Sequence, residues 1–298
     1  SSSRLFDRCF TMVFDRTSWA ACGSTLLFVL LWGSGAIFAR LGLDHASPFA
    51  FLVLRFALAC AALLLLASLR GRWLPAPGQR RQTLLTGLLM IGGYTICYLL
   101  ALDRGLTPGV LATVLGVQPI LTLALLERRF AALRLVGLGM ALGGLGLVVN
   151  EGLQHSHLSA EGMLFALAAL ACMTLGAIRQ KGQEQAPMAV LPLQYGVSLL
   201  ACVLVLPFQP WQLRFSLDFL VPLLWMALVI SVAAQLLLYR LIRAGNLVDV
   251  TSLFYLVPVV TAAMDYLILG NRLSTSALGG MLAILLGLLL VFRFAPRQ

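Results

Sequence analysis

The chain contains ten apolar runs, each about as long as a helix must be to cross a lipid bilayer. A bilayer's hydrocarbon core is about 30 Å thick, and an α-helix rising about 1.5 Å per residue needs about 20 apolar residues to span it. The sequence therefore predicts an all-α polytopic membrane protein with ten transmembrane helices. Approximately, the runs cover residues 20–39, 47–69, 83–101, 107–126, 133–150, 161–178, 188–206, 218–239, 247–269 and 275–292.

The composition excludes a water-soluble domain. Hydrophobic residues make up 60% of the 298 residues and charged residues 11%, whereas soluble domains are about half apolar and about a quarter charged. The formal net charge of +10 does not indicate nucleic-acid binding, because the arginines stand between apolar runs instead of forming a continuous patch. The expected partners are the lipid bilayer and a small-molecule substrate, and no cofactor or metal is expected.

The basic residues also predict the orientation. Positively charged short connections are retained in the cytoplasm, and 16 of the 21 Lys and Arg residues lie on the side that holds both termini, with four on the other side and one inside a span. We expect both termini, and a short N-terminal segment over 1–19, to lie on the cytoplasmic side of the cell inner (plasma) membrane. The sequence leaves a monomer and a homodimer equally open.

A weak internal repeat runs along the whole chain. A shift of 139 positions aligns Ser47-Pro48 with Ala186-Pro187, Arg55-Phe56 with Gln194-Tyr195, and Pro119 with Pro258. Each unit contains five spans, and an odd number makes the second unit enter the membrane from the opposite face. The sequence predicts two inverted five-helix repeats, over 20–150 and 151–298, an architecture typical of secondary transporters.

Several motifs resemble one known family. They are Leu31-Trp32-Gly33-Ser34-Gly35 in the first span, Ser47-Pro48 with Leu54-Arg55-Phe56 in the second, Pro119 followed by Leu126-Glu127-Arg128, and the Gly-rich fifth and tenth spans. From about residue 20 to 293 the chain resembles the ten-helix EamA-type family of the drug/metabolite transporter superfamily. It departs from that family's pattern at Gly270-Asn271-Arg272, which lacks the acid often found there. The resemblance implies alternating access to a central cavity, and it is greatest to members that export amino acids or related metabolites.

Polar and aromatic side chains at membrane depth are the candidates for binding a substrate, because they are costly there unless they face a cavity or another helix. Tyr94 and Tyr98 are four residues apart and share one helix face, which favours a cavity. For Trp32 and Ser34 the alternative is close helix packing, and for Gln118 and Gln235 it is a hydrogen bond to another helix. The predicted substrate-binding residues are Trp32, Ser34, Tyr94, Tyr98, Gln118, Gln235 and Tyr255.

Pro119 and Pro258 are the predicted hinges. Each removes one backbone hydrogen bond from its helix, and the two occupy matching positions in the two repeats. Symmetry-related interruptions of this kind are typical of transporters. The alternative is that proline is simply common in membrane helices.

Other intramembrane groups receive structural interpretations. Arg55, about two turns inside the second span, is expected to be structural, Tyr239 is expected to lie in the interfacial aromatic belt, and the glycines of the fifth and tenth spans are expected to pack helices. Asp265 is the one carboxylate placed well inside a predicted span. It lies toward the outer end of that span, so proton coupling through it is not indicated.

These patterns favour a secondary transporter that exports small metabolites, with amino acids first. A multidrug efflux transporter of lipophilic compounds is the alternative within transporters. An intramembrane enzyme is disfavoured, because all three histidines fall in predicted connections and no HExxH motif is present. Nucleotide-sugar or phosphate exchange would need a more basic cavity.

Overall fold

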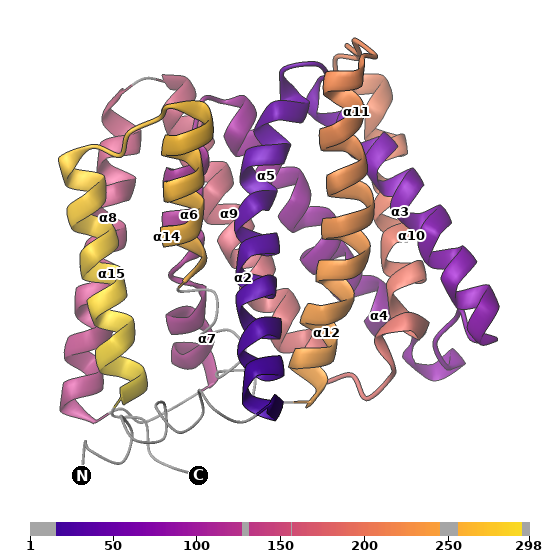
Figure 1. The fold of residues 1–298 in the computed structure, drawn as a ribbon, viewed down its shortest axis with the longest axis horizontal. Coiled ribbons are helices and arrows are strands. Elements are labelled where there is room, and N and C mark those ends of the chain that lie inside the picture. The colour runs from indigo at the N-terminus through magenta and orange to yellow at the C-terminus, as the bar shows by residue number, and fades with distance from the viewer. Residues whose placement is uncertain (1–15, 127–130, 156, 245–255, 294–298) are drawn as a thin grey trace.

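A computed structural model describes residues 16–126, 131–155, 157–244 and 256–293. These residues form helices joined by short connections, with one isolated antiparallel bridge between Ala46 and Leu213. The all-α prediction is confirmed. The helices stand roughly side by side, and the first residue of α2 and the last of α15 lie at the same end of the bundle (Figure 1).

The helices of the first half follow the predicted runs. The third and fourth are divided: a π-helix, η2, joins α4 to α5, and a break separates α6 from α7. The bounds are α2 (Arg16–Leu43), α3 (Pro48–Arg70), η1 (Pro77–Gln79), α4 (Arg80–Gly87), η2 (Leu88–Gly93), α5 (Tyr94–Asp103), α6 (Pro108–Leu115), α7 (Gln118–Leu126) and α8 (Ala132–His155).

The second half repeats this order. A π-helix, η4, again interrupts the third helix of the half. The bounds are α9 (His157–Lys181), α10 (Pro187–Val205), η3 (Leu206–Phe208), α11 (Leu217–Leu224), η4 (Trp225–Ala234), α12 (Gln235–Ala244), α14 (Val257–Met264), η6 (Asp265–Leu269) and α15 (Thr275–Arg293).

Eight helical segments of the described residues are long and apolar enough to cross a membrane. Two further apolar helices are shorter, Val257–Leu269 and Thr275–Val291. The predicted span over 247–269 begins in residues outside the described part of the chain, so the count of ten spans stays a prediction. A multi-pass membrane protein is nevertheless indicated by length and composition.

Prolines and glycines set several helix ends. Pro48, Pro108 and Pro187 each stand at the start of a helix after an extended residue, where the missing N–H is not needed and φ is already helical. Gly71 ends α3 and Gly270 ends η6 in the left-handed conformation, with φ of 75° and 74°, which glycine adopts without strain.

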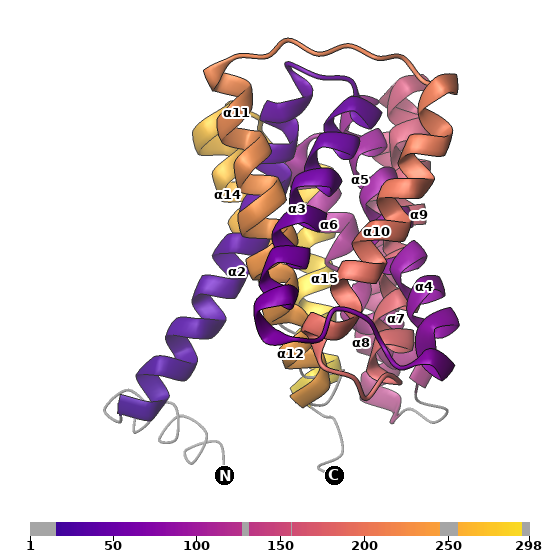
Figure 2. The ribbon, with the colours of Figure 1, turned by 90° about the vertical axis from the view of Figure 1, so that its right-hand side faces the viewer.

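Corresponding helices of the two halves pack against each other. α3 packs on α10, α6 on α14 and α8 on α15, while α2 contacts η4 and α9 contacts η2. Figure 2 shows α3 and α10 side by side, with α3 descending from the top of the view and α10 rising from the bottom. This antiparallel placement of matched helices agrees with the predicted inverted repeat.

Glycine packing joins α8 to α15. A Cβ placed on Gly144 would lie 2.5 Å from the carbonyl oxygen of Gly280, and one on Gly137 would lie 2.7 Å from that of Gly287. The two backbones touch because neither has a side chain there. The predicted packing role is wrong for the other glycines of the series, which face open space: Gly139, Gly143, Gly146 and Gly279.

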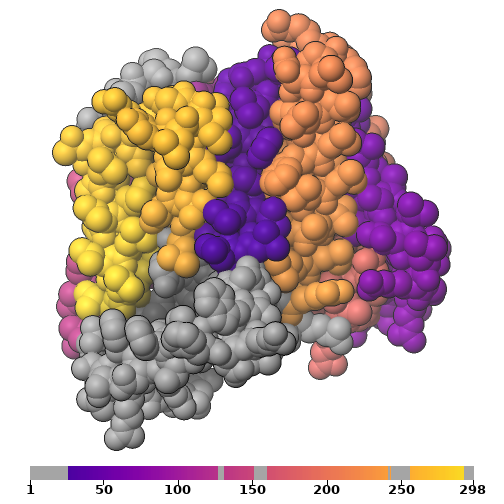
Figure 3. All heavy atoms as spheres, in the orientation of Figure 1, coloured from indigo at the N-terminus to yellow at the C-terminus, as the bar shows by residue number. Residues whose placement is uncertain are grey.

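The outer surface of the bundle is apolar, as a lipid-facing surface must be. Leu69 of α3, Leu267 of η6 and Leu282 of α15 expose 77%, 78% and 60% of their surface. On the face in Figure 3, atoms of α14, α2 and the segment from α11 to α12 form a continuous wall. Some polar side chains, such as Arg55 and Gln194, are buried.

Candidate functional site

Two adjoining cavities lie between the two halves, and both are lined by Trp32, Tyr94 and Tyr98. Each has a volume of about 30 Å³, which is enough for a water molecule and far below the roughly 300–1,000 Å³ of small-molecule pockets. The first cavity is completed by Ala112, Leu115, Gly116, Gln118, Met173, Val257 and Thr261. The second is completed by Gly35, Arg55, Met90, Ile91, Thr95, Tyr195, Met226, Ile230 and Gln235.

The three aromatic rings that line both cavities come from two helices. Tyr94 and Tyr98 lie one turn apart on α5, with ring centroids 5.6 Å apart and planes tilted by 56°. Trp32 of α2 stacks on Phe28 at 5.6 Å. The structure thus brings Trp32 into the same cavity linings as the tyrosine pair, which the sequence had singled out separately from it.

Gln118 and Gln235 also reach these cavities, one in each. Both are buried, at 2% and 6% exposure, and the amide nitrogen of each has no hydrogen-bond partner among the described residues. Buried polar atoms are nearly always paired with protein or water. The two amides are therefore donors available to a molecule in the cavity.

Arg55 lines the second cavity, although the sequence predicted only a structural role. Its Nε donates to Oγ of Ser231 at 2.9 Å, and that hydroxyl donates to the carbonyl of Met226 at 2.7 Å. Both partners belong to η4, so the π-helix positions the guanidinium. The cavity lining is completed on this side by Tyr195, whose ring meets Phe56 edge-on at 5.7 Å.

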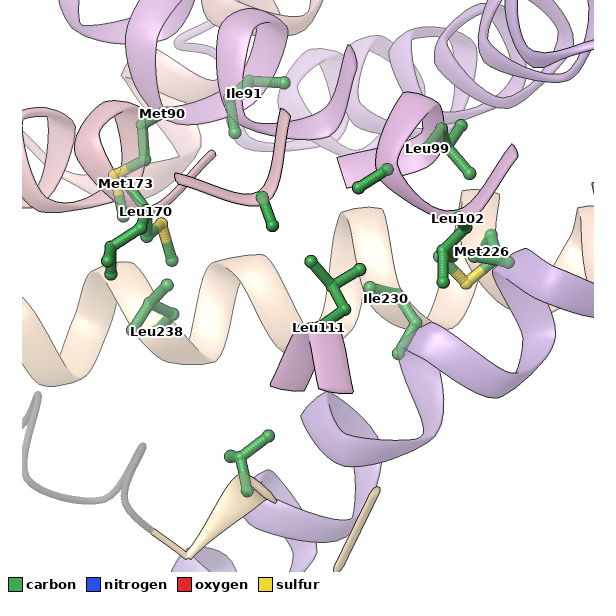
Figure 4. Packing of buried hydrophobic residues seen from close by; sticks show 14 of the residues in the cluster. Met90, Ile91, Leu99, Leu102, Leu111, Leu170, Met173, Met226, Ile230 and Leu238 are labelled. Carbon is green, nitrogen blue, oxygen red and sulfur yellow. The ribbon is translucent and has the colours of Figure 1, made fainter. Parts of the chain in front are cut away.

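Several lining residues were not predicted, because apolar side chains carry no signal in an apolar helix. Met90, Met173, Met226 and Ile230 are visible among the buried side chains packed between the helices in Figure 4. A signal did exist for Tyr195, since the repeat aligns Arg55-Phe56 with Gln194-Tyr195.

Ser34 stands apart from this site. The Ser34 hydroxyl donates to Leu31 O at 2.7 Å and accepts from the indole N–H of Trp225 at 3.1 Å. These contacts join α2 to η4, in keeping with the helix-packing alternative, and Ser34 lines neither cavity. Tyr255 lies outside the described residues.

The predicted hinge prolines lie at the starts of helical segments. Helix α6 ends at Leu115, and α7 begins at Gln118 with Pro119 as its second residue. Pro258 is the second residue of α14. Both rings are buried, and whether they act as hinges stays a prediction.

The π-helices η2 and η4 occupy matching places in the two repeats and were not predicted. Met90 and Ile91 of η2 line the second cavity, as do Met226 and Ile230 of η4. π-Helical turns frequently occur at functional sites. Their extra residue per turn shifts the side chains that follow, including Tyr94 and Gln235.

The prediction for Tyr239 is wrong. Its side chain is 1% exposed, and its hydroxyl donates to Oε1 of Gln194 at 2.6 Å. Gln194 in turn donates to Oε1 of Gln180 at 3.1 Å. Tyr239 therefore belongs to a buried hydrogen-bond network that ties α12 to α10 and α9, because an amide acceptor lies within reach in the tertiary structure.

Asp265 also has a structural environment. Its carboxylate accepts from the backbone N–H of Gly109 and from Nδ2 of Asn271, both at 2.8 Å. Gly109 lies in the first turn of α6, where free N–H groups and the helix dipole favour an anion. The carboxylate thus links the second half to the first, joining the start of η6 to the first turn of α6.

Comparison with known proteins agrees with this architecture. The model of the EamA-like transporter family matches the chain twice, over residues 19–150 and 160–293. A probable amino-acid metabolite efflux pump of Salmonella typhimurium is 27% identical over 92% of this chain and 95% of its own length. An uncharacterized transporter, YvbV, of Bacillus subtilis is 24% identical over 88% of each chain.

The fold has a solved counterpart. One crystal structure of a protein superposes with a TM-score of 0.64 at 19% identity, covering 93% of this chain and 99% of that one. At that identity the likeness concerns the fold alone. Since the family model covers nearly the whole described bundle in two copies, the chain belongs to the EamA-like transporter family.

Proposed function

We propose that this transporter exports amino acids or closely related small metabolites across the cell inner (plasma) membrane, with both termini in the cytoplasm. The observation that carries the proposal is the lining of the central cavities, where aromatic rings lie beside amide donors that have no partner among the described residues. Such a lining suits a small solute with polar and apolar parts. The similarity to the Salmonella typhimurium pump supports the same substrate class.

Alternating access is the proposed mechanism. The cavities in this conformation are too small for a solute of amino-acid size, so the helices around them must separate to admit one. We infer that the two halves rock about the central site, with bending near Pro119 and Pro258 opening opposite faces in turn. The π-helices supply further places where α5 and α12 can shift.

Multidrug efflux is the second candidate, favoured by the apolar and aromatic share of the lining. Export of lipophilic cations, however, is best served by a carboxylate in the cavity. Neither cavity lining includes an acid, and the carboxylate of Asp265 is engaged with Gly109 and Asn271. An intramembrane enzyme has still less support, because members of this family are transporters.

Uptake into proteoliposomes tests the proposal. Purified protein would be offered a radiolabelled amino-acid panel and a lipophilic dye, each with and without an imposed pH gradient, beside protein-free liposomes. Saturable uptake blocked by excess unlabelled amino acid is the expected result. Dye transport without amino-acid uptake would favour multidrug efflux, and the pH-gradient arm reveals whether protons drive the cycle.

A further inference from the structure

Arg55 is a buried cation without a carboxylate partner in the described part of the chain. It is 6% exposed, and its one hydrogen bond among the described residues goes from Nε to Ser231. The ion pairs of the described residues lie elsewhere and join Arg40 to Asp44 and Arg104 to Glu161. A guanidinium has five N–H donors, so the donors on its two terminal nitrogens remain available.

A buried charge is strongly destabilising unless something compensates it. The groups that face Arg55 in its cavity are the phenols of Tyr94, Tyr98 and Tyr195 and the amide of Gln235. All of them are neutral, and they come from α5, α10 and α12. The charge of the cavity lining is therefore positive, set by Arg55.

The cavity lining combines polar and apolar groups. In the same cavity as Arg55, Gln235 presents an amide nitrogen that lacks a partner among the described residues. Apart from Thr95, the remaining wall is apolar or aromatic and includes Trp32, Met90, Met226 and Ile230. A ligand that matches this wall carries one anionic group and one apolar group.

We propose that Arg55 binds the carboxylate of the transported solute, with Nε2 of Gln235 as a second donor and the ring of Trp32 against the solute's apolar part. The inference rests on the proposed function and names its substrate class: small monocarboxylates with an apolar or aromatic side chain, zwitterionic amino acids included. The planar guanidinium matches a carboxylate in two-point geometry. Ser231 fixes Nε and so orients the free edge of the guanidinium.

Three ligands of nearly equal size separate the contributions of the charged groups. Phenylalanine has a carboxylate and an ammonium, phenylalaninamide lacks the carboxylate, and 3-phenylpropionate lacks the ammonium. Binding is read from the shift that each ligand causes in the melting temperature of detergent-solubilised protein, and from competition with uptake of radiolabelled phenylalanine. The amide should bind about ten-fold or more weakly than the two carboxylates, because it forms no charge-assisted pair.

The variants Arg55→Gln, Arg55→Lys and Ser231→Ala test the assignment. Arg55→Gln should bind both carboxylates about ten-fold or more weakly and change the amide's affinity much less, which removes the discrimination. Arg55→Lys keeps the positive charge but lacks the planar two-point geometry of a guanidinium. It should therefore retain part of the discrimination between the carboxylates and the amide. Arg72→Gln, an exposed arginine outside the cavity, is the matched control and should behave as wild type.

Two failures can be told apart. Saturable uptake of none of the amino-acid panel would overturn the proposed function. If the wild-type protein took up amino acids but bound phenylalanine and phenylalaninamide equally well, the proposed function would stand. Only the carboxylate site at Arg55 would be overturned. Should Arg55→Gln fail to fold, the three ligands on the wild-type protein decide the question, and Ser231→Ala then tests whether the orientation of Arg55 matters.

Discussion

The ring of Pro258 packs against Gly116 so closely that a Cβ added to Gly116 would lie 2.6 Å from the ring carbon Cγ. Gly116 directly follows α6 at its break, and Pro258 is the second residue of α14. The contact joins the break between α6 and α7 in the first half to the proline near the start of α14 in the second half. It also lies at the wall of the first cavity, which Gly116 lines.

Gly116→Ala should therefore destabilise the protein, because the new methyl group and the rigid ring cannot both keep their places. We expect a loss of about 1–3 kcal/mol in unfolding free energy, read as a lower melting temperature in detergent. Adding Pro258→Ala should recover part of the loss by removing Cγ. Gly139→Ala, on an exposed face with open space around it, is the control, and equal effects of the two alanines would contradict the packing argument.

The hinge hypothesis predicts slower transport without weaker binding. In correctly inserted protein, Pro119→Ala together with Pro258→Ala should remove the restriction that each proline places on a continuous helix and lower the maximal uptake rate several-fold, with the half-saturating concentration little changed. Proteoliposome kinetics measure both quantities. A double variant that transports at the wild-type rate would remove the hinge role from these prolines.

Trp32 and Tyr94 should contribute directly to affinity, since both line the two cavities. Trp32→Ala or Tyr94→Ala should weaken substrate binding by about 1–3 kcal/mol, through lost apolar contact. Ligand-induced melting shifts give the affinity, and Trp73→Ala, which removes a 52% exposed tryptophan after α3, is the control. Unchanged affinity in both variants would exclude the two rings from the site.

Asp265 should be needed for stability. Asp265→Ala leaves the buried N–H of Gly109 without its acceptor, which should cost about 1–3 kcal/mol. Asp265→Asn keeps an acceptor oxygen and should cost less. Melting temperatures of the Asp265 variants test this prediction. The control is Asp103→Asn, which alters an exposed carboxylate and should melt like wild type. If Asp265→Ala melted like wild type but abolished pH-driven uptake, Asp265 would have a role in proton coupling instead.

The predictions that succeeded from sequence depend on patterns along the chain. Apolar runs separated by arginines predicted the helices, because each helix needs enough apolar residues to cross the bilayer. The 139-residue shift predicted two repeats of opposite sense, because each unit holds an odd number of spans. Tyr94 and Tyr98 could be placed on one face since four residues make about one helical turn. The tertiary structure then brought these rings together with Trp32, Gln118 and Gln235.

What the sequence by itself determined is the class of the molecule: a helical membrane bundle of two repeats, fixed by the length of each apolar run and by the match between the halves. Only the tertiary structure decided which buried polar groups are already paired. Tyr239 and Asp265 find partners within the fold, whereas the amides of Gln118 and Gln235 and the guanidinium of Arg55 face the cavities. Hydrogen-bond satisfaction depends on atoms brought from distant helices to within about 3 Å, and no pattern along one helix specifies that.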